Sequence, residues 1–195
     1  MRVIAGTAKG RKLKAPRGRT IRPTSDRVKE AIFNMIGTEV VGASVLDLFA
    51  GTGALGIEAL SRGAEKSTFV DESRKAVSLV DENLRLTDLR DKGKVIKGKV
   101  ETVIERLVGE RELYNLIFLD PPYRISVTML SSICQRVADA LLAADGLMIL
   151  EHSSKLESPD ISGVKNGASK KYGDTAVTVY RKEGTGDDGD MPGEF

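Results

Sequence analysis

The tetrapeptide Asp120–Tyr123 carries the most discriminating chemistry in the sequence. It directly follows the apolar run Leu116–Leu119, which predicts a buried strand, and its two prolines fix the backbone in an extended turn. Such a turn can direct the Asp120 carboxylate and the Pro121 carbonyl toward one point, with the Tyr123 ring beside them. Two acceptors that hold both N–H bonds of an aromatic amine favour a pyramidal nitrogen, whose lone pair can attack a methyl group. The aromatic ring would stack on the base.

A glycine-rich turn within Asp47–Gly56 is the second candidate site. It follows a predicted strand and precedes a predicted helix, which is where open parallel sheets bind ligands. Gly51 and Gly53 would let the backbone approach a ligand closely, and the start of the helix would offer free N–H groups to a carboxylate or phosphate. The G-x-G-x-x-G pattern also fits dinucleotide enzymes, so the pattern alone leaves the cofactor open.

Charge around this turn favours S-adenosylmethionine (SAM). An anion such as Asp47 just before the glycines would repel a pyrophosphate, whereas it could meet the ammonium group of SAM directly or through water. Asp71, at the end of the next predicted strand, lies where an acid accepts hydrogen bonds from two ribose hydroxyls in either class of cofactor. We therefore predict SAM as the cofactor, bound by Asp47, Phe49, Gly51, Gly53 and Asp71.

The first 30 residues are strongly basic. They hold ten lysines and arginines against two acids, a net charge of +8, which leaves −6 on the remainder because the whole chain has +2. A basic segment of this kind is typical of a protein that meets phosphate backbones. Charge alone is equally compatible with a solvated surface or with another anionic partner.

Hydrophobic periodicity predicts the elements that position these residues. Strand-like and helix-like segments alternate, which predicts a parallel sheet with helices on both faces. The predicted strands are 44–49, 66–70, 94–97, 114–119 and 147–151, and the predicted helices are 54–62, 74–86, 101–108 and 127–142. Two further strands, 164–171 and 176–181, are joined by too few residues for a crossover helix and must pair antiparallel.

The two ends of the chain depart from this alternation. Residues 2–5 and 12–14 predict a small basic β-hairpin, and the helix that follows begins at Ser25 or Asp26 and ends at Gly37. Residues 183–195 are rich in Gly and Asp with almost no apolar side chains, which predicts a disordered tail. We expect three parts: a hairpin-and-helix extension (1–40), a methyltransferase domain (41–182) and the tail (183–195).

Composition excludes several classes of protein. With 195 residues, of which 41% are hydrophobic and 30% charged, the chain can bury one core of good size. No apolar run approaches the roughly 20 residues of a membrane span, and no signal peptide is evident, so we expect a soluble cytoplasmic protein. A single cysteine, Cys134, and a single histidine, His152, leave too few soft ligands for a usual zinc site. We expect no metal, a Cys134 in the core and no catalytic role for His152.

A family resemblance rests on these motifs and on further blocks. Asp120–Tyr123 resembles motif IV of the amino-methyltransferases that modify adenine N6, cytosine N4 or guanine N2, and Asp47–Gly53 resembles their motif I. Further blocks are similar to signatures of the bacterial RsmD-type enzymes, which methylate guanine N2 in 16S ribosomal RNA. These blocks are residues 2–6, 9–13, 21–28, 30–35 and 171–175, with Tyr180, so the resemblance covers essentially 2–182.

The resemblance implies an α/β, Rossmann-like SAM-dependent methyltransferase fold, whose seven-stranded sheet is parallel except for the last strand. It implies SAM as the methyl donor and Asp120, Pro121 and Tyr123 as the catalytic residues that bind the guanine amine. It implies 16S ribosomal RNA as the partner, within a small ribosomal subunit or an assembly intermediate. We also expect a monomer. The basic hairpin would then hold RNA phosphates through Lys9, Arg11, Lys12, Arg19 and Arg22.

Three other functions remain open. A DNA methyltransferase for adenine N6 or cytosine N4 would share both motifs, although a sequence-specific one usually needs a sizeable recognition domain. A nicotinamide oxidoreductase would use Gly51–Gly56 and Asp71 but would leave Asp120–Tyr123 without a role. A non-catalytic RNA-binding module would explain the basic segment, and only loss of activity on a change at Asp120 would exclude it.

Overall fold

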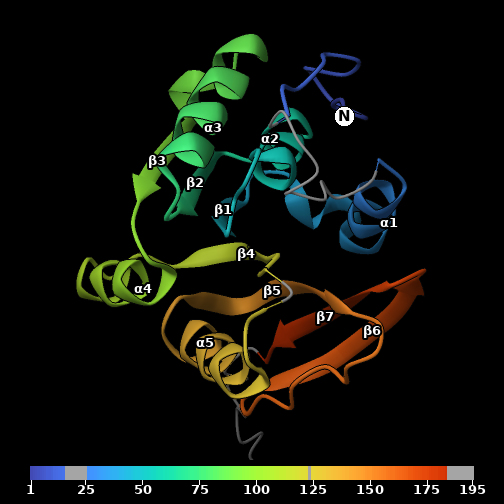
Figure 1. Ribbon diagram of the computed structural model, residues 1–195, viewed down its shortest axis with the longest axis vertical. Helices are drawn as coiled ribbons and strands as arrows, with labels where there is room; N and C mark the ends of the chain where they lie inside the picture. The colour runs from blue at the N-terminus through green and yellow to red at the C-terminus, as the bar shows by residue number, and fades with distance from the viewer. Residues whose placement is uncertain (16–25, 123, 184–195) are drawn as a thin grey trace, which may run out of the picture.

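The computed structural model describes residues 1–15, 26–122 and 124–183. Its centre is a seven-stranded sheet in the order β3-β2-β1-β4-β5-β7-β6 (Figure 1). The strands are β1 (Ser44–Leu48), β2 (Lys66–Asp71), β3 (Gly93–Lys97), β4 (Tyr114–Leu119), β5 (Leu142–Ser153), β6 (Val164–Tyr172) and β7 (Thr175–Lys182). Strands β1 to β5 pair in parallel, and β7 is antiparallel to both β5 and β6. Six strands therefore run one way and one runs the other, which confirms the predicted fold.

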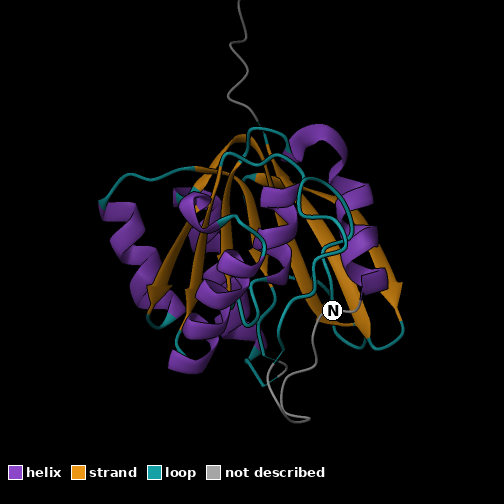
Figure 2. Ribbon diagram, turned by 90° about the horizontal axis from the view of Figure 1, so that it is seen from above, coloured by secondary structure: helices purple, strands orange, loops and turns teal. Residues whose placement is uncertain are grey.

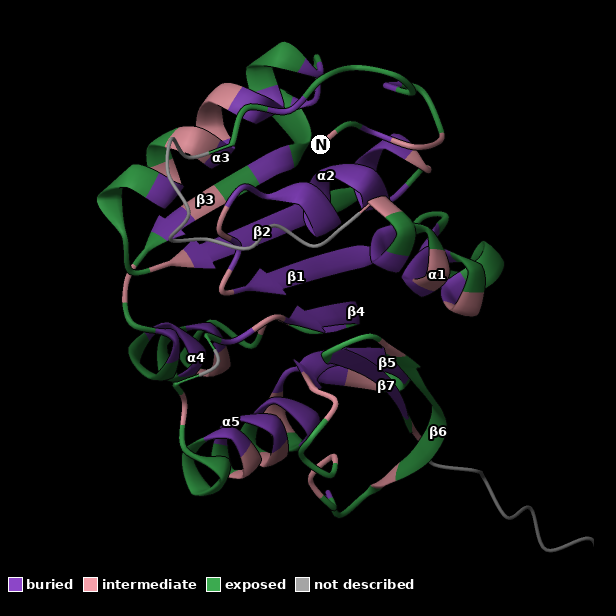
Figure 3. Ribbon diagram, turned by 45° about the vertical axis from the view of Figure 1, so that its right-hand side comes forward, coloured by how far each residue is buried: buried purple, intermediate pink, exposed green. Residues whose placement is uncertain are grey.

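Helices cover both faces of the sheet (Figure 2). They are α1 (Asp26–Ile36), α2 (Ala54–Ser61), α3 (Arg74–Leu86), α4 (Val100–Gly109) and α5 (Val127–Ala140), with short 3₁₀ turns η1 (Gly37–Val40) and η2 (Arg90–Lys92). One core lies between the sheet and α1, α2 and α3, and a second lies between the sheet and α4 and α5. Every residue of β1 is buried because this central strand is covered on both faces (Figure 3).

Strand β5 differs most from its prediction. It begins at Leu142, five residues before the predicted start, and α5 ends at Ala140 instead of 142. Leu142 pairs with Tyr114, but the register shifts before the next pair, and Asp145 adopts a positive φ of 59°. Small and acidic residues occupy this irregular start of β5. It therefore lacks the alternation of apolar side chains by which a strand is predicted from sequence.

The amino-terminal segment packs on α2 more than on itself. The predicted pairing of residues 2–5 with 12–14 consists of one antiparallel bridge, between Arg2 and Lys12. The backbone N–H groups of Ile4 and Ala5 donate instead to the Glu58 carboxylate of α2, at 2.8 and 3.0 Å. These donors are thus used by a buried side chain, which keeps the hairpin shorter than predicted.

A buried charge cluster completes this contact. Glu58 and Lys29 are both fully buried, and the Lys29 Nζ lies 3.0 Å from one Glu58 carboxylate oxygen while the Arg62 Nε lies 2.8 Å from the other. Gly6 approaches the same helix so closely that a Cβ atom there would lie 1.7 Å from the Ser61 carbonyl oxygen. The cluster therefore joins the amino-terminal segment, α1 and α2 into one packed unit.

Candidate active site

The carboxyl ends of three neighbouring strands meet at one edge of the sheet. Leu48, the last residue of β1, pairs with Val70 of β2 on one side and with Leu119 of β4 on the other. Asp71 and Asp120 each follow one of these partners, so they flank the first turn residue after β1 from both sides. Order in the sheet reverses between β1 and β4, which is where open α/β sheets bind ligands.

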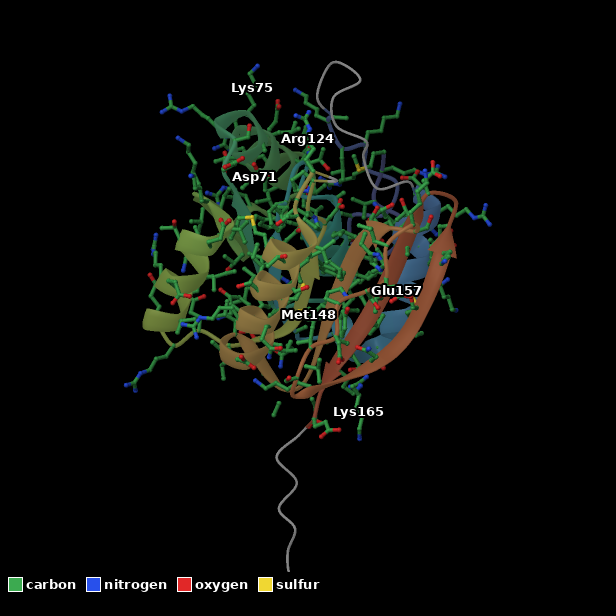
Figure 4. The ribbon with its side chains drawn as sticks, turned by 60° about the horizontal axis from the view of Figure 1, so that its bottom comes forward. Asp71, Lys75, Arg124, Met148, Glu157 and Lys165 are labelled. Atoms are coloured by element: carbon green, nitrogen blue, oxygen red, sulfur yellow. The ribbon has the colours of Figure 1, made fainter. Side chains whose placement is uncertain are left out.

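Residues that follow different strands gather at this edge in the side-chain view. Figure 4 places Asp71, Lys75 of the first turn of α3, and Arg124 toward the same edge, with Lys165 at the opposite end of the molecule. Asp71 ends β2, whereas Arg124 comes after β4, so residues 53 positions apart in sequence lie at the same edge. The topology thus brings the end of β2 and the segment after β4 to one edge (Figure 4).

The glycine-rich turn needs left-handed backbone at three positions. The φ angles are 63° at Phe49, 56° at Gly51 and 75° at Gly53, and Gly53 forms the N-cap of α2. A Cβ atom at Gly53 would lie 3.2 Å from a methyl group of Val80 on α3. At Gly51 only the Phe49 carbonyl oxygen lies within 4 Å of such an atom, at 3.9 Å, so this stretch of backbone is open to a ligand.

Asp71 fixes the shape of this turn. One of its carboxylate oxygens accepts a hydrogen bond from the Gly51 N–H at 2.9 Å, and the other accepts one from the Ser73 N–H at 2.8 Å. Ser73 in turn caps α3, because its hydroxyl accepts from the Ala76 N–H at 3.4 Å. Each carboxylate oxygen can accept a further bond, and the side chain is half-buried, so Asp71 can also meet hydroxyl groups.

Asp47 lies beneath the turn. It is 2% exposed, and its carboxylate accepts a hydrogen bond from the Gly56 N–H of α2 at 2.9 Å. Burial raises the pKa of Asp47 from 3.8 to about 8; the Gly56 bond opposes this rise, and the charges of Asp120 and Asp71 add to it. Below about pH 8 the folded protein therefore holds Asp47 in its protonated form beneath the turn.

The carboxylates of Asp71 and Asp120 give the site a negative potential. The charges of Asp71 and Asp120 act on Asp47, so the acids at the ends of β1, β2 and β4 are close enough to interact. A cationic ligand relieves this repulsion, whereas a pyrophosphate would add to it. The arrangement fits SAM, which carries a sulfonium and an ammonium group, and disfavours a nicotinamide dinucleotide.

Asp47→Asn should stabilise the protein, and increasingly so as the pH rises. The folded-state pKa of Asp47 is raised, so between about pH 4 and pH 8 the folded protein holds a proton that the unfolded chain has lost, and stability falls across this window. Asparagine avoids this cost and keeps an acceptor for the Gly56 N–H. We expect the gain in melting temperature to increase by at least about 4 °C between about pH 5 and pH 9 in thermal unfolding. A gain that does not change with pH would contradict the raised pKa.

The Asp120 motif forms a tight turn into α5. Asp120 is half-buried and Pro121 is buried, and the Ile125 N–H donates to the Pro122 carbonyl at 2.9 Å. The Ser126 hydroxyl then caps α5 by accepting from the Met129 N–H at 3.2 Å. One backbone bond and the Ser126 cap thus connect the end of β4 to the start of α5; Tyr123 lies outside the described residues.

The predicted RNA-binding residues that the structure describes fall into two groups. Lys9 and Lys12 are exposed. Arg11 is engaged within the protein, because its guanidinium lies 2.6 Å from the Asp88 carboxylate and donates to the Leu86 carbonyl at 3.0 Å. Arg19 and Arg22 lie outside the described residues.

Sequence reasoning missed three buried polar residues. Lys29, Glu58 and Asn83 are each fully buried on helices whose neighbouring buried positions are mainly apolar. A polar side chain at a core position of an amphipathic helix is the signal that could have identified them, since such a group needs a partner. What the pattern does not indicate is which distant segment provides that partner.

The single cysteine and the single histidine of the chain are both buried. Cys134 is fully buried, and burial raises its thiol pKa, as expected for a core position. His152 is 7% exposed, and its Nε2 lies 3.0 Å from the Thr178 hydroxyl. Within residues 1–15, 26–122 and 124–183, no cluster of His, Cys, Asp and Glu could hold a metal ion, and no helix is long and apolar enough to cross a membrane.

Comparisons with known proteins cover nearly the whole chain. The family model described as "Conserved hypothetical protein 95" matches residues 1–181. The chain is 42% identical over 186 residues to a Bacillus subtilis protein named "Putative rRNA methyltransferase YlbH", covering 94% of this chain and 100% of that protein. It is 32% identical over 189 residues to "Ribosomal RNA small subunit methyltransferase D" of Escherichia coli, covering 96% and 92%. The solved structure of "Putative methyltransferase yhhF" from Escherichia coli superposes with a TM-score of 0.80 at 32% identity, covering 94% and 98%.

Proposed function

The chain belongs to the family described as conserved hypothetical protein 95, and from this membership we propose that it is an RsmD-type enzyme that methylates ribosomal RNA with SAM as the methyl donor. The predicted family resemblance is thereby confirmed. The observation that carries the function is the meeting of the glycine-rich turn, Asp71 and Asp120 at one sheet edge in a chain whose relatives are named rRNA methyltransferases.

The residues at this edge suit SAM. When bound, SAM would supply a sulfonium methyl group that a nucleophile can attack, with the thioether S-adenosylhomocysteine as the leaving group. The open backbone at Gly51 and the half-buried Asp71 carboxylate would hold the nucleoside and the amino-acid ends, and Phe49 is the first residue of the turn after β1. Asp47 and Gly53 act from beneath the turn: Asp47 accepts the Gly56 N–H at the start of α2, and Gly53 lets α3 pack against the turn.

Asp120 and Pro121 would orient the amine that is methylated. The Asp120 carboxylate and the Pro121 carbonyl would each accept a hydrogen bond from one N–H group of the amine. The lone pair of the nitrogen would then point away from the two acceptors. The Tyr123 ring would stack on the base. A methylated ammonium is acidic enough to lose its extra proton to Asp120 or water, so the site needs no strong general base.

From the family resemblance we propose that the methylated group is the N2 amine of a guanine in 16S ribosomal RNA. The family relative in Escherichia coli is named for the small subunit. We further propose that the RNA is presented within a small ribosomal subunit or an assembly intermediate, and that the enzyme acts as a monomer in the cytoplasm.

The test is methyl transfer from labelled SAM to unmodified small ribosomal subunits, to naked ribosomal RNA and to duplex DNA. The modified nucleoside is identified by mass spectrometry. We expect N2-methylguanosine from the ribosomal substrates alone, and comparison of particle with naked RNA tests the need for assembly. A methylated adenine or cytosine in DNA would support a DNA amino-methyltransferase instead, and absence of transfer would support a non-catalytic RNA-binding module.

Changing Lys9 and Lys12 together to alanine should weaken RNA binding and reduce its salt dependence. Both side chains are exposed, and each RNA phosphate that is no longer neutralised should lower the slope of log K against log salt by about 1. Arg11→Ala is the matched control, because the Arg11 guanidinium is already paired with Asp88 and has less charge to offer a phosphate. Filter binding over a range of salt concentrations measures both slopes. If the double variant keeps the wild-type slope, the segment does not bind RNA phosphates.

A further inference from the structure

The Asn83 side chain connects two segments that the proposed function uses separately. Asn83 lies on α3 and is fully buried. Its Oδ1 accepts from the Lys14 N–H at 2.8 Å, and its Nδ2 donates to the Lys14 carbonyl at 3.1 Å and to the Thr52 carbonyl at 2.9 Å. Both amide protons of Nδ2 are thus used, so the carboxamide is fully engaged between the basic segment and the glycine-rich turn.

The bond to Lys14 fastens the end of the described amino-terminal segment. The carboxamide binds both backbone groups of Lys14, as a neighbouring strand would. Exposed ion pairs lie on either side of this contact: Lys14 pairs with Glu82, and Arg11 pairs with Asp88. Surface pairs contribute little, about 0–1 kcal/mol each, so the buried amide contact is the specific one. Residue 14 leads directly into the chain that carries Arg19 and Arg22.

The bond to Thr52 acts on the cofactor turn. Thr52 lies between Gly51, whose N–H is held by Asp71, and Gly53, which packs against Val80 one turn before Asn83 on α3. The Thr52 hydroxyl also donates to the Met1 sulfur at 3.7 Å. The orientation of the Thr52 peptide therefore depends on α3 and on the amino-terminal segment as well as on the strand edge.

We propose that Asn83 is a positioning residue that couples cofactor binding to the docking of residues 1–15, the described start of the basic segment, so that each favours the other. The inference rests on the proposed function and adds a regulation of the same site. A ligand that holds the Gly51–Gly53 turn fixes the Thr52 carbonyl, which orients the Asn83 carboxamide and so favours its two bonds to Lys14. Coupling of this kind is reciprocal: a docked segment strengthens cofactor binding by the same factor.

Hydrogen exchange at the Lys14 amide tests the coupling without RNA or turnover. The exchange rate is measured by NMR on the full chain, free and saturated with S-adenosylhomocysteine (SAH), and the SAH dissociation constant is measured by calorimetry. We expect saturation to slow exchange at Lys14 about tenfold, and Asn83→Ala to abolish this slowing and raise the dissociation constant about tenfold. Glu82→Gln is the matched control: it removes the charge of the ion pair with Lys14, keeps the Asn83 amide contact, and should retain both the slowing and the affinity.

The outcomes separate the inference from the function on which it rests. Unchanged Lys14 exchange in saturated wild-type protein would overturn the coupling, and this measurement stands even if Asn83→Ala does not fold. A folded Asn83→Ala protein with wild-type SAH affinity would overturn it too. If the Glu82→Gln control lost the slowing as well, the surface pair and not Asn83 would carry the effect. A wild-type protein that does not bind SAH would instead refute the cofactor assignment.

Discussion

Asp120→Ala should lower kcat for methyl transfer to ribosomal RNA by at least about 10³-fold, and should change the SAM dissociation constant by less than about threefold. The carboxylate is the one ionised acceptor in the proposed grip on the amine, and the Pro121 carbonyl alone would leave one N–H bond unheld. Asp120 follows β4 in register with the end of β1, so it stands beside the cofactor turn without being part of it. Its loss should therefore affect the chemical step and leave binding of the cofactor intact.

Two further variants sharpen this test. Asp120→Asn keeps one acceptor oxygen and should retain more activity than Asp120→Ala. Asp139→Ala removes an exposed carboxylate on α5 that accepts from the Gln135 side chain, and it should leave kcat unchanged. Single-turnover methylation with saturating SAM measures the chemical step, and calorimetry measures binding. Full activity of Asp120→Ala would refute the proposed role of the motif.

Asp71→Ala should raise the dissociation constant for SAM by about 100-fold. Two effects combine in this variant: the cofactor loses a carboxylate acceptor, and the Gly51 and Ser73 N–H groups lose the charged partner that holds the turn against the start of α3. Hydrogen bonds to charged groups contribute about 1.5–3 kcal/mol each, and 100-fold corresponds to about 2.8 kcal/mol. The loss of one such bond to the ligand, together with a less ordered turn, accounts for the size of the effect.

A neighbouring acid provides the control for this variant. Glu72→Gln changes the next residue, which is exposed, and should leave SAM affinity within about twofold of wild type because surface charges contribute little. Calorimetry with SAH gives the same comparison without turnover. If Asp71→Ala bound SAH as tightly as the wild type, Asp71 would serve only the local backbone, and another group would have to bind the ribose.

Much of the fold and the position of the candidate site could be predicted from the sequence. Helix α3 and strand β4 have the predicted bounds, because the period of their apolar residues is unambiguous and clear turn residues follow them. The short link after β6 predicted the antiparallel pair correctly. Because parallel strands end at one edge of a sheet, the positions of Asp47, Asp71 and Asp120 in the sequence also predicted that they would meet there.

What the tertiary structure alone decided is which distant groups each polar side chain meets. Asp47 lies beneath the turn with a raised pKa, and Glu58 and Asn83 each bind backbone groups more than 50 residues away. Periodicity reports whether a position is buried, since burial repeats along one element. Choice of partner depends on how separate elements pack, and no local pattern records it. The sequence by itself therefore determined the elements and the chemistry at the strand ends, and the packing of α2 and α3 against the amino-terminal segment determined how those residues are held.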